Sequence, residues 1–111
     1  MLKLKSYDEE YDIKFQLTNY ESNNSLAILM MCFDKEYKYW EPYGYLTVNL
    51  EEFSDGLPED CAYVDTNNLE GIGDWIVENQ LGEPTGMIGY SGYCSYPMFQ
   101  FDLAKIKENL M

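Results

Sequence analysis

Between Lys38 and Lys105 the chain runs for 66 residues with twelve Asp and Glu side chains and without one Lys or Arg. The whole chain of 111 residues contains no His and has a formal net charge of −13. Carboxylates in such a segment have no local cation to neutralise them, so they repel one another unless solvent or a basic partner relieves the repulsion. We therefore expect a compact globule with a strongly negative surface around an apolar core.

The composition supplies that core, because 46% of the residues are hydrophobic and 16% are aromatic. This apolar content separates the chain from disordered acidic proteins, and its length fits one domain. We expect residues 1–111 to form a single α+β domain, with an antiparallel sheet of about five strands and two helices packed on it.

Three segments have the hydrophobic patterns of strands. Residues 11–18 and 46–50 alternate apolar and polar side chains, which is typical of half-buried strands. Residues 26–33 form an unbroken apolar run, which is typical of a central strand covered on both faces. We expect an antiparallel meander of these three, with a charged connection over residues 34–44.

The second half of the chain alternates strand and helix patterns. We expect a short strand over residues 61–65, an irregular loop or bulged hairpin over 83–95 and a strand over 96–101. A helix is predicted from Asn67 or Asn68 to about Leu81, with Gly82 as its C-terminal stop. A second short helix follows, capped by Asp102, with Leu103, Ile106 and Leu110 at helical spacing.

The acidic residues suggest two candidate binding clusters. Glu70, Asp74 and Glu78 recur every four residues, which on a continuous helix forms a stripe with about 6 Å between neighbours. Such a stripe is either an ordinary solvated helix face or a row of charges that imitates a phosphate backbone. The second cluster lies in the preceding loop and is either an ordinary charged loop or an extension of that row: Glu51, Glu52, Asp55, Glu59 and Asp60.

The eleven tyrosines are the other excess in the composition. Tyr39 and Trp40 lie in one aromatic cluster, and Tyr90 and Tyr93 lie in another beside the glycine-rich segment. Such rings give large contact areas at low entropic cost and are enriched in protein interfaces. The alternative is that they cap the open ends of the sheet. We assign these four to partner binding.

Catalytic, cofactor and metal sites lack the residues they need. No His is available as a base, shuttle or metal ligand, and Cys32, Cys61 and Cys94 form no CxxC pair. Gly86, Gly89 and Gly92 are not followed by the Lys-Ser/Thr pair of a phosphate-binding loop. We expect a protein that is not an enzyme and uses no cofactor or metal.

The same composition restricts location and partners. Strong negative charge opposes binding to nucleic acid or anionic membranes and favours basic protein surfaces. No window of the chain has the roughly 20 apolar residues of a membrane span, and residues 1–8 do not resemble a signal peptide. We expect a soluble, reduced, cytoplasmic protein.

Four segments carry a resemblance to a known group of proteins: residues 62–68, residues 78–82 with 85–86, residues 89–97 and residues 101–103. They are similar to a family of small uncharacterised proteins carried by conjugative elements and phages of Gram-positive bacteria. The resemblance implies no catalytic residues. In composition alone, the chain is also similar to acidic anti-CRISPR and anti-restriction proteins.

Two functions follow as hypotheses. The first is an inhibitor that mimics DNA and occupies the DNA-binding groove of a Cas or restriction nuclease, through the two acidic clusters and the aromatic anchors. The second is an interaction module of a mobile element, working as a homodimer through its aromatic faces, with the charge serving solubility.

Overall fold

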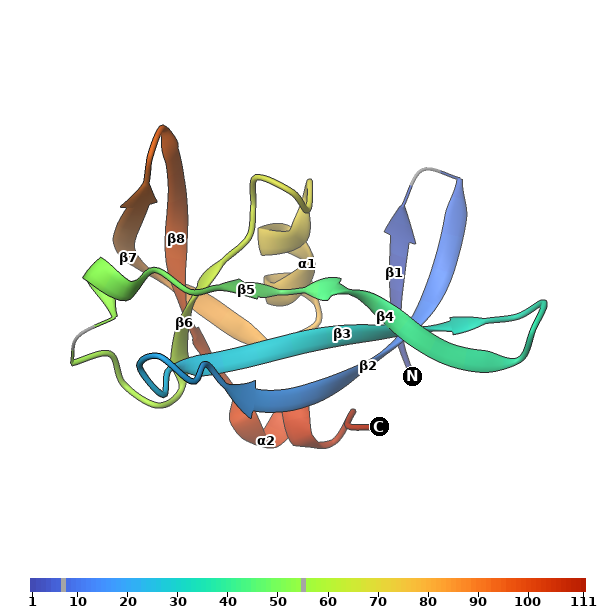
Figure 1. Cartoon of the computed structure of the whole chain (residues 1–111). Helices are drawn as coiled ribbons and strands as arrows, with labels where there is room; N and C mark the ends of the chain where they lie inside the picture. Colours follow the sequence, from blue (N-terminus) through green and yellow to red (C-terminus); the bar gives the residue numbers. More distant parts are fainter. Residues whose placement is uncertain (7, 55) are drawn as a thin grey trace.

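The computed structural model describes residues 1–6, 8–54 and 56–111. It confirms the α+β class, but the strands form two antiparallel sheets of four strands each, and the expectation of one sheet of about five is wrong. The first sheet has the order β1-β2-β3-β4 and the second the order β5-β6-β8-β7 (Figure 1). The first-sheet strands are β1 (Leu2–Ser6), β2 (Glu9–Asn19), β3 (Leu26–Asp34) and β4 (Tyr39–Tyr45). The second-sheet strands are β5 (Thr47–Val48), β6 (Cys61–Val64), β7 (Gly82–Ser91) and β8 (Cys94–Phe101).

The helices are short. They are a 3-10 turn η1 (Glu51–Phe53), α1 (Ile72–Glu78) and α2 (Leu103–Lys107). None of the helices among the described residues is long and apolar enough to cross a membrane.

The predicted strands at residues 11–18 and 26–33 are confirmed as β2 and β3. Ile13 and Phe15 of β2 are fully buried, as the alternation predicts. β3 lies between β2 and β4 and buries Leu26, Ala27 and Ile28 in succession, which requires cover on both faces. The apolar run is therefore the central strand of the first sheet.

The connection predicted at residues 34–44 is wrong, because β4 occupies most of it. β4 is an edge strand, and its register with β3 shifts between Met30 and Met31, which face Gly44 and Pro42. A proline is compatible with a strand at such an edge or bulge, where its missing N–H breaks no ladder. The third strand predicted at residues 46–50 is reduced to the two residues of β5, which pairs in the other sheet.

The chain crosses from one sheet to the other at Leu46 and Thr47. The Leu46 N–H donates to the Ile28 carbonyl of β3 (2.8 Å), and the Leu46 carbonyl accepts from the Asp65 N–H after β6 (3.0 Å). Thr47 Oγ1 accepts from the Ile28 N–H (3.1 Å). The Tyr20 hydroxyl contacts both Thr47 Oγ1 and the Thr47 carbonyl, each at 3.1 Å. These two buried residues join the sheets, Leu46 through its main chain and Thr47 through its side chain.

The predicted helix over residues 67–81 exists only as α1, which is shorter at both ends. Gly71 is its N-cap, with a left-handed φ of 74°. Asn68 does not cap the helix; its side chain donates to the Asp65 carboxylate instead. At the other end Gln80 has a φ of 59°, and the Leu81 N–H donates to the Ile76 carbonyl (2.9 Å). This Schellman closure stops the helix before the predicted stop at Gly82.

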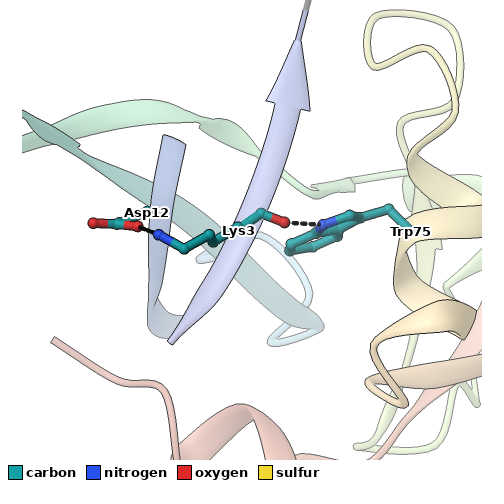
Figure 2. A network of polar contacts seen from close by, with 3 residues as sticks. All are labelled: Lys3, Asp12 and Trp75. Atoms are coloured by element: carbon teal, nitrogen blue, oxygen red, sulfur yellow. Dashed lines mark hydrogen bonds and ion pairs between the residues drawn. The ribbon is translucent and has the colours of Figure 1, made fainter. Parts of the chain in front are cut away.

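Trp75 of α1 fixes the helix between the sheets. Its ring packs edge-to-face against Phe15 with centroids 6.4 Å apart, and its indole Nε1 donates to the Lys3 carbonyl of β1 (2.7 Å). Figure 2 shows this bond together with the ion pair between Lys3 and Asp12, which face each other across β1 and β2. The buried side chains of both sheets, α1 and α2 form one continuous core.

The C-terminal strand and helix cap are confirmed, but α2 ends at Lys107, so Leu110 of the predicted helical face lies outside the helix. β7 and β8 form a bulged hairpin, with the register shift between Pro84 and Ile88. The Asp102 side chain caps α2 by accepting from the Lys105 N–H (3.1 Å). Phe15 then exchanges main-chain hydrogen bonds with Asn109 and Met111 (2.9 and 3.0 Å), so the last residues cover the edge of β2 beyond β1.

Thr47→Val tests the crossover. The substitution keeps the side-chain shape but leaves the buried Ile28 N–H without an acceptor, and it removes one of the two contacts of the Tyr20 hydroxyl, which still has the main-chain carbonyl of residue 47. We expect the free energy of unfolding to fall by about 1–3 kcal/mol in urea denaturation. Thr18→Val, at an exposed position of β2, is the matched control and should change stability by less than about 0.5 kcal/mol. Equal effects of the two substitutions would contradict the role of the crossover.

Candidate functional site

The carboxylates between residues 39 and 104 lie mainly on the surface. Of those in the described part of the chain, Asp65 is buried, Glu41 and Asp60 are partly buried, and the rest are exposed. In the same described residues one ion pair is present, Lys3 with Asp12, and it lies outside this segment. Its hydrogen bond raises the pKa of Lys3 and lowers the pKa of Asp12. Within the described residues, the carboxylates of the segment 39–104 are therefore not neutralised by ion pairs.

The predicted stripe of Glu70, Asp74 and Glu78 is only partly formed. Glu70 precedes the left-handed Gly71 and so lies outside α1, where it lines a cleft of about 460 Å³ together with Lys5. Asp74 and Glu78 are exposed on successive turns of α1. One helix face thus presents two of the three carboxylates.

The acidic loop folds around η1. The Phe53 N–H and the Ser54 hydroxyl donate to the Leu50 carbonyl (3.0 and 2.6 Å), which closes the turn. The Tyr63 hydroxyl of β6 donates to the Phe53 carbonyl (2.9 Å), which ties the turn to the second sheet. Glu51 and Glu52 are held exposed at its start.

Aromatic packing joins η1 to the β7–β8 hairpin. The Phe53 ring lies edge-to-face to both Tyr63 and Tyr90, with centroids 6.5 and 6.1 Å apart. Gly89 of β7 permits this approach, because a Cβ at this position would lie 2.7 Å from Leu50 Cδ1 and 2.9 Å from Tyr63 Cε1. The glycine is required by close packing, and its neighbour Tyr90 stays more than half exposed.

Two clefts flank Glu51 and Glu52. One, of about 340 Å³, lies against Tyr90, Ser91 and Gly92 at the end of the hairpin. The other, of about 720 Å³, lies against the turn between β2 and β3 and continues to Glu59. Within that turn, the Asn23 side chain donates to Asn49 Oδ1 (2.8 Å), which anchors the turn beside η1. We call the surface formed by Glu51, Glu52, Phe53, Glu59 and Tyr90 the acidic end.

The prediction for this cluster also named Asp55 and Asp60. Asp55 lies outside the described residues. Asp60 has a structural role: its carboxylate accepts from Gln100 Nε2 (3.1 Å) and its carbonyl accepts from the Phe101 N–H (2.7 Å). These bonds fasten the loop to β8.

The four predicted aromatic anchors are divided between two regions. Tyr90 belongs to the acidic end, and Tyr93 is fully exposed in the turn between β7 and β8. Tyr39 and Trp40 lie on β4 next to the β3–β4 turn, at the opposite end of the molecule from η1 (Figure 1). Trp40 is packed against Phe33 and has the Lys14 ammonium 5.0 Å from its ring centroid. One binding surface therefore cannot include all four.

The three cysteines differ in accessibility. Cys32 and Cys61 are buried and Cys94 is exposed. Burial raises the pKa of both buried thiols, that of Cys61 to about 11 with a further contribution from the nearby Asp60 carboxylate. At neutral pH these two side chains are thiols and not thiolate nucleophiles.

Phe53, which connects the acidic loop to Tyr90, was not among the residues predicted from the sequence. The available signal was the only aromatic residue of the loop, directly after two adjacent acids. Asn23 and Asn49 were not predicted as partners either, because only the fold brings them together.

The fold and this surface define a small two-sheet α+β protein with an acidic end. Residues 14–110 match a family described as a domain of unknown function, DUF4313, and the chain belongs to that family. The resemblance to an uncharacterised family is confirmed to this extent. No curated protein and no solved structure matches the chain. The matched residues run from β2 to the C-terminal segment, so they include the acidic end.

Gly89→Ala tests how η1 is held. The added methyl group overlaps Leu50 and Tyr63, so we expect a loss of about 1–3 kcal/mol in the free energy of unfolding, with NMR shift changes at Phe53. Gly44→Ala is the control, because a Cβ there meets nothing within 4 Å. Unchanged stability and unchanged Phe53 shifts in the Gly89 variant would contradict the close packing.

Thiol labelling tests the burial of the cysteines. At about pH 8, one thiol per folded chain should react rapidly with a disulfide reagent, and the other two only after unfolding. Cys94→Ser should abolish the rapid phase. A rapid phase that persists in this variant would show that Cys32 or Cys61 is accessible.

Proposed function

We propose that this chain is a non-enzymatic binding protein that docks its acidic end onto a basic surface of a partner protein. The observation that supports this proposal is that Glu51, Glu52 and Glu59 are exposed and form no ion pair within the described part of the chain, and that Glu51 and Glu52 lie beside the exposed rings of Phe53 and Tyr90. Fixed carboxylates attract a basic surface over long range and orient it. The two rings supply apolar surface that is buried from water when the partner binds, and buried aromatic side chains commonly contribute most of the affinity of an interface.

The more specific form of the proposal is that the basic surface is the nucleic-acid-binding groove of a host-defence nuclease, which the protein would inhibit as a DNA mimic. Such a groove is lined by Lys and Arg that bind phosphates, and clustered carboxylates are the side chains that can replace those phosphates. The similarity in composition to anti-restriction and anti-CRISPR proteins, and the resemblance to proteins of phages and conjugative elements, support this form. Binding would then exclude DNA.

An alternative function is a homodimeric interaction module, and a separate observation favours it. The β3–β4 end exposes Tyr37 and Tyr39, and the lysines of that turn, Lys35 and Lys38, reduce the local negative charge. Two copies would repel one another least at this end. A concentration-dependent mass in sedimentation, abolished by Tyr37→Ser with Tyr39→Ser, would favour this function.

Charge reversal tests the proposed docking surface. We expect the triple variant Glu51→Lys, Glu52→Lys and Glu59→Lys to weaken partner binding by about tenfold or more, because it places like charges in the interface. The matched control reverses Glu70, Asp74 and Glu78, which makes the same change in net charge elsewhere. Its effect should be small and should vanish at high salt.

The measurement uses purified restriction and CRISPR nucleases, with DNA binding and cleavage followed at low and high salt. Inhibition that competes with DNA and weakens steeply with salt supports the nuclease form. If no nuclease responds but basic proteins captured from a host lysate depend on the acidic end, the general proposal holds without the nuclease form. If the two triple variants lose partner binding equally, only the net charge of the protein matters and not the acidic end, which would contradict the proposal.

A further inference from the structure

β7 is an edge strand whose exposed residues are uncharged over most of its length, from Thr85 to Ser91. It lies last in the second sheet, and Thr85–Ser91 contains no charged residue. Met87, Ile88 and Tyr90 are each at least half exposed. In Figure 1 the β7–β8 hairpin projects beyond the rest of the second sheet. A long edge strand of this kind is a template for pairing with another chain.

The other edge strands are protected. β1 carries Lys3 and Lys5, and the Trp75 indole occupies its Lys3 carbonyl. β4 contains Glu41 and Pro42 at a register shift, and β5 has two residues. Lysines, proline, bulges and short length are the usual devices that prevent edge pairing. In β7 the proline and the register shift are confined to the part before Ile88, and Ile88–Ser91 pairs regularly with β8 and lacks all of these devices.

The register shows which main-chain groups of β7 point outward. Ser91 faces Cys94 across a two-residue turn, Gly89 faces Tyr96, and Ile88 faces Pro97. Antiparallel pairs alternate between bonded and non-bonded, and Pro97 has no N–H to donate. Ile88 and Tyr90 therefore occupy the non-bonded positions. Their N–H and C=O groups point away from β8, toward the open side.

The charges around this edge indicate the chemistry of its partner. Glu51 and Glu52 share a cleft with Tyr90 and Ser91, and Glu83 lies at the other end of β7. A strand added here would run between these carboxylates, so Lys or Arg side chains on it would be attracted. A second copy of the chain would instead bring together two molecules of net charge −13.

We propose that β7 accepts an extended, basic segment of a partner protein as an added strand, paired with the N–H and C=O groups of Ile88 and Tyr90. Main-chain hydrogen bonds give affinity in this mode of recognition, and the exposed side chains of Met87 and Ile88 contact the alternate side chains of the added strand. The inference rests on the proposed function, since it specifies how the basic partner is bound beside the acidic end.

The probe is a synthetic peptide of about ten residues that alternates Lys and Val. At saturation and low salt, the amide hydrogens of Ile88 and Tyr90 should exchange at least about tenfold more slowly, because each becomes a donor or is covered by the added strand. The Gly89 amide, already bonded to β8, should change little. Peptide binding without slower exchange at these two amides, or no binding, would overturn the added strand.

Two substitutions at one position provide the matched variants. Ile88→Pro removes an N–H that the fold does not use, so the variant should stay folded and lose peptide affinity by about tenfold. Ile88→Thr keeps the N–H and should bind within about threefold of the original chain. If Ile88→Pro does not fold, the test uses the original chain with the same peptide methylated on alternate main-chain amides. This peptide should also bind about tenfold more weakly, because the methyl groups remove its N–H donors.

Further outcomes separate this inference from the proposed function. Equal binding of an alternating Glu and Val peptide would overturn the selection of a basic segment. Slower exchange at Ile88 and Tyr90 on raising the protein concentration alone would assign the edge to a second copy. If partner binding depends on Glu51, Glu52 and Glu59 but is unchanged by Ile88→Pro, the proposed function stands and the added strand is overturned.

Discussion

The main chain of Leu46 is the connection on which the arrangement of the two sheets depends. Its N–H bonds to Ile28 in the first sheet and its carbonyl bonds to Asp65 after β6 in the second. Thr47 adds a side-chain bond to the same Ile28. Each bond is buried, so breaking one leaves an unsatisfied polar group in a low-dielectric interior. Because Leu46 and β5 are bonded to the end of β6, the crossover determines the position of β6 and of the acidic loop that precedes it.

Local patterns predicted the elements whose burial is decided within one segment. β2 alternates, β3 is apolar throughout, and α2 begins at a capping Asp102, so sequence alone identified all three. β4 was missed because its stability comes from pairing with β3 and not from its own pattern. β1 does alternate Leu with Lys over Leu2–Lys5, a signal too short to decide a strand without its partner β2. The division into two sheets was unpredictable for the same reason, since it depends on hydrogen bonds between residues distant in sequence.

The acidic residues show the same limit at the candidate site. The four-residue spacing of Glu70, Asp74 and Glu78 is correct for a helix, but the left-handed backbone at Gly71 delays the helix start until after Glu70. The acids of the loop, Glu51, Glu52 and Glu59, are exposed as predicted, because exposure of a charged loop does not depend on where a helix begins. Tyr90 is brought to this loop by tertiary packing through Phe53.

Net charge and the open β7 edge are physically related. An uncharged, exposed edge strand usually invites self-pairing, and proteins commonly place lysines along it to prevent this. Here the long-range repulsion between copies of net charge −13 opposes self-pairing without any charge on Thr85–Ser91. The same field attracts a basic chain to the edge. The cation-free segment and the unprotected β7 edge therefore have one physical explanation in common: the negative charge keeps other copies of the chain away from the edge and still allows a positively charged segment to approach it.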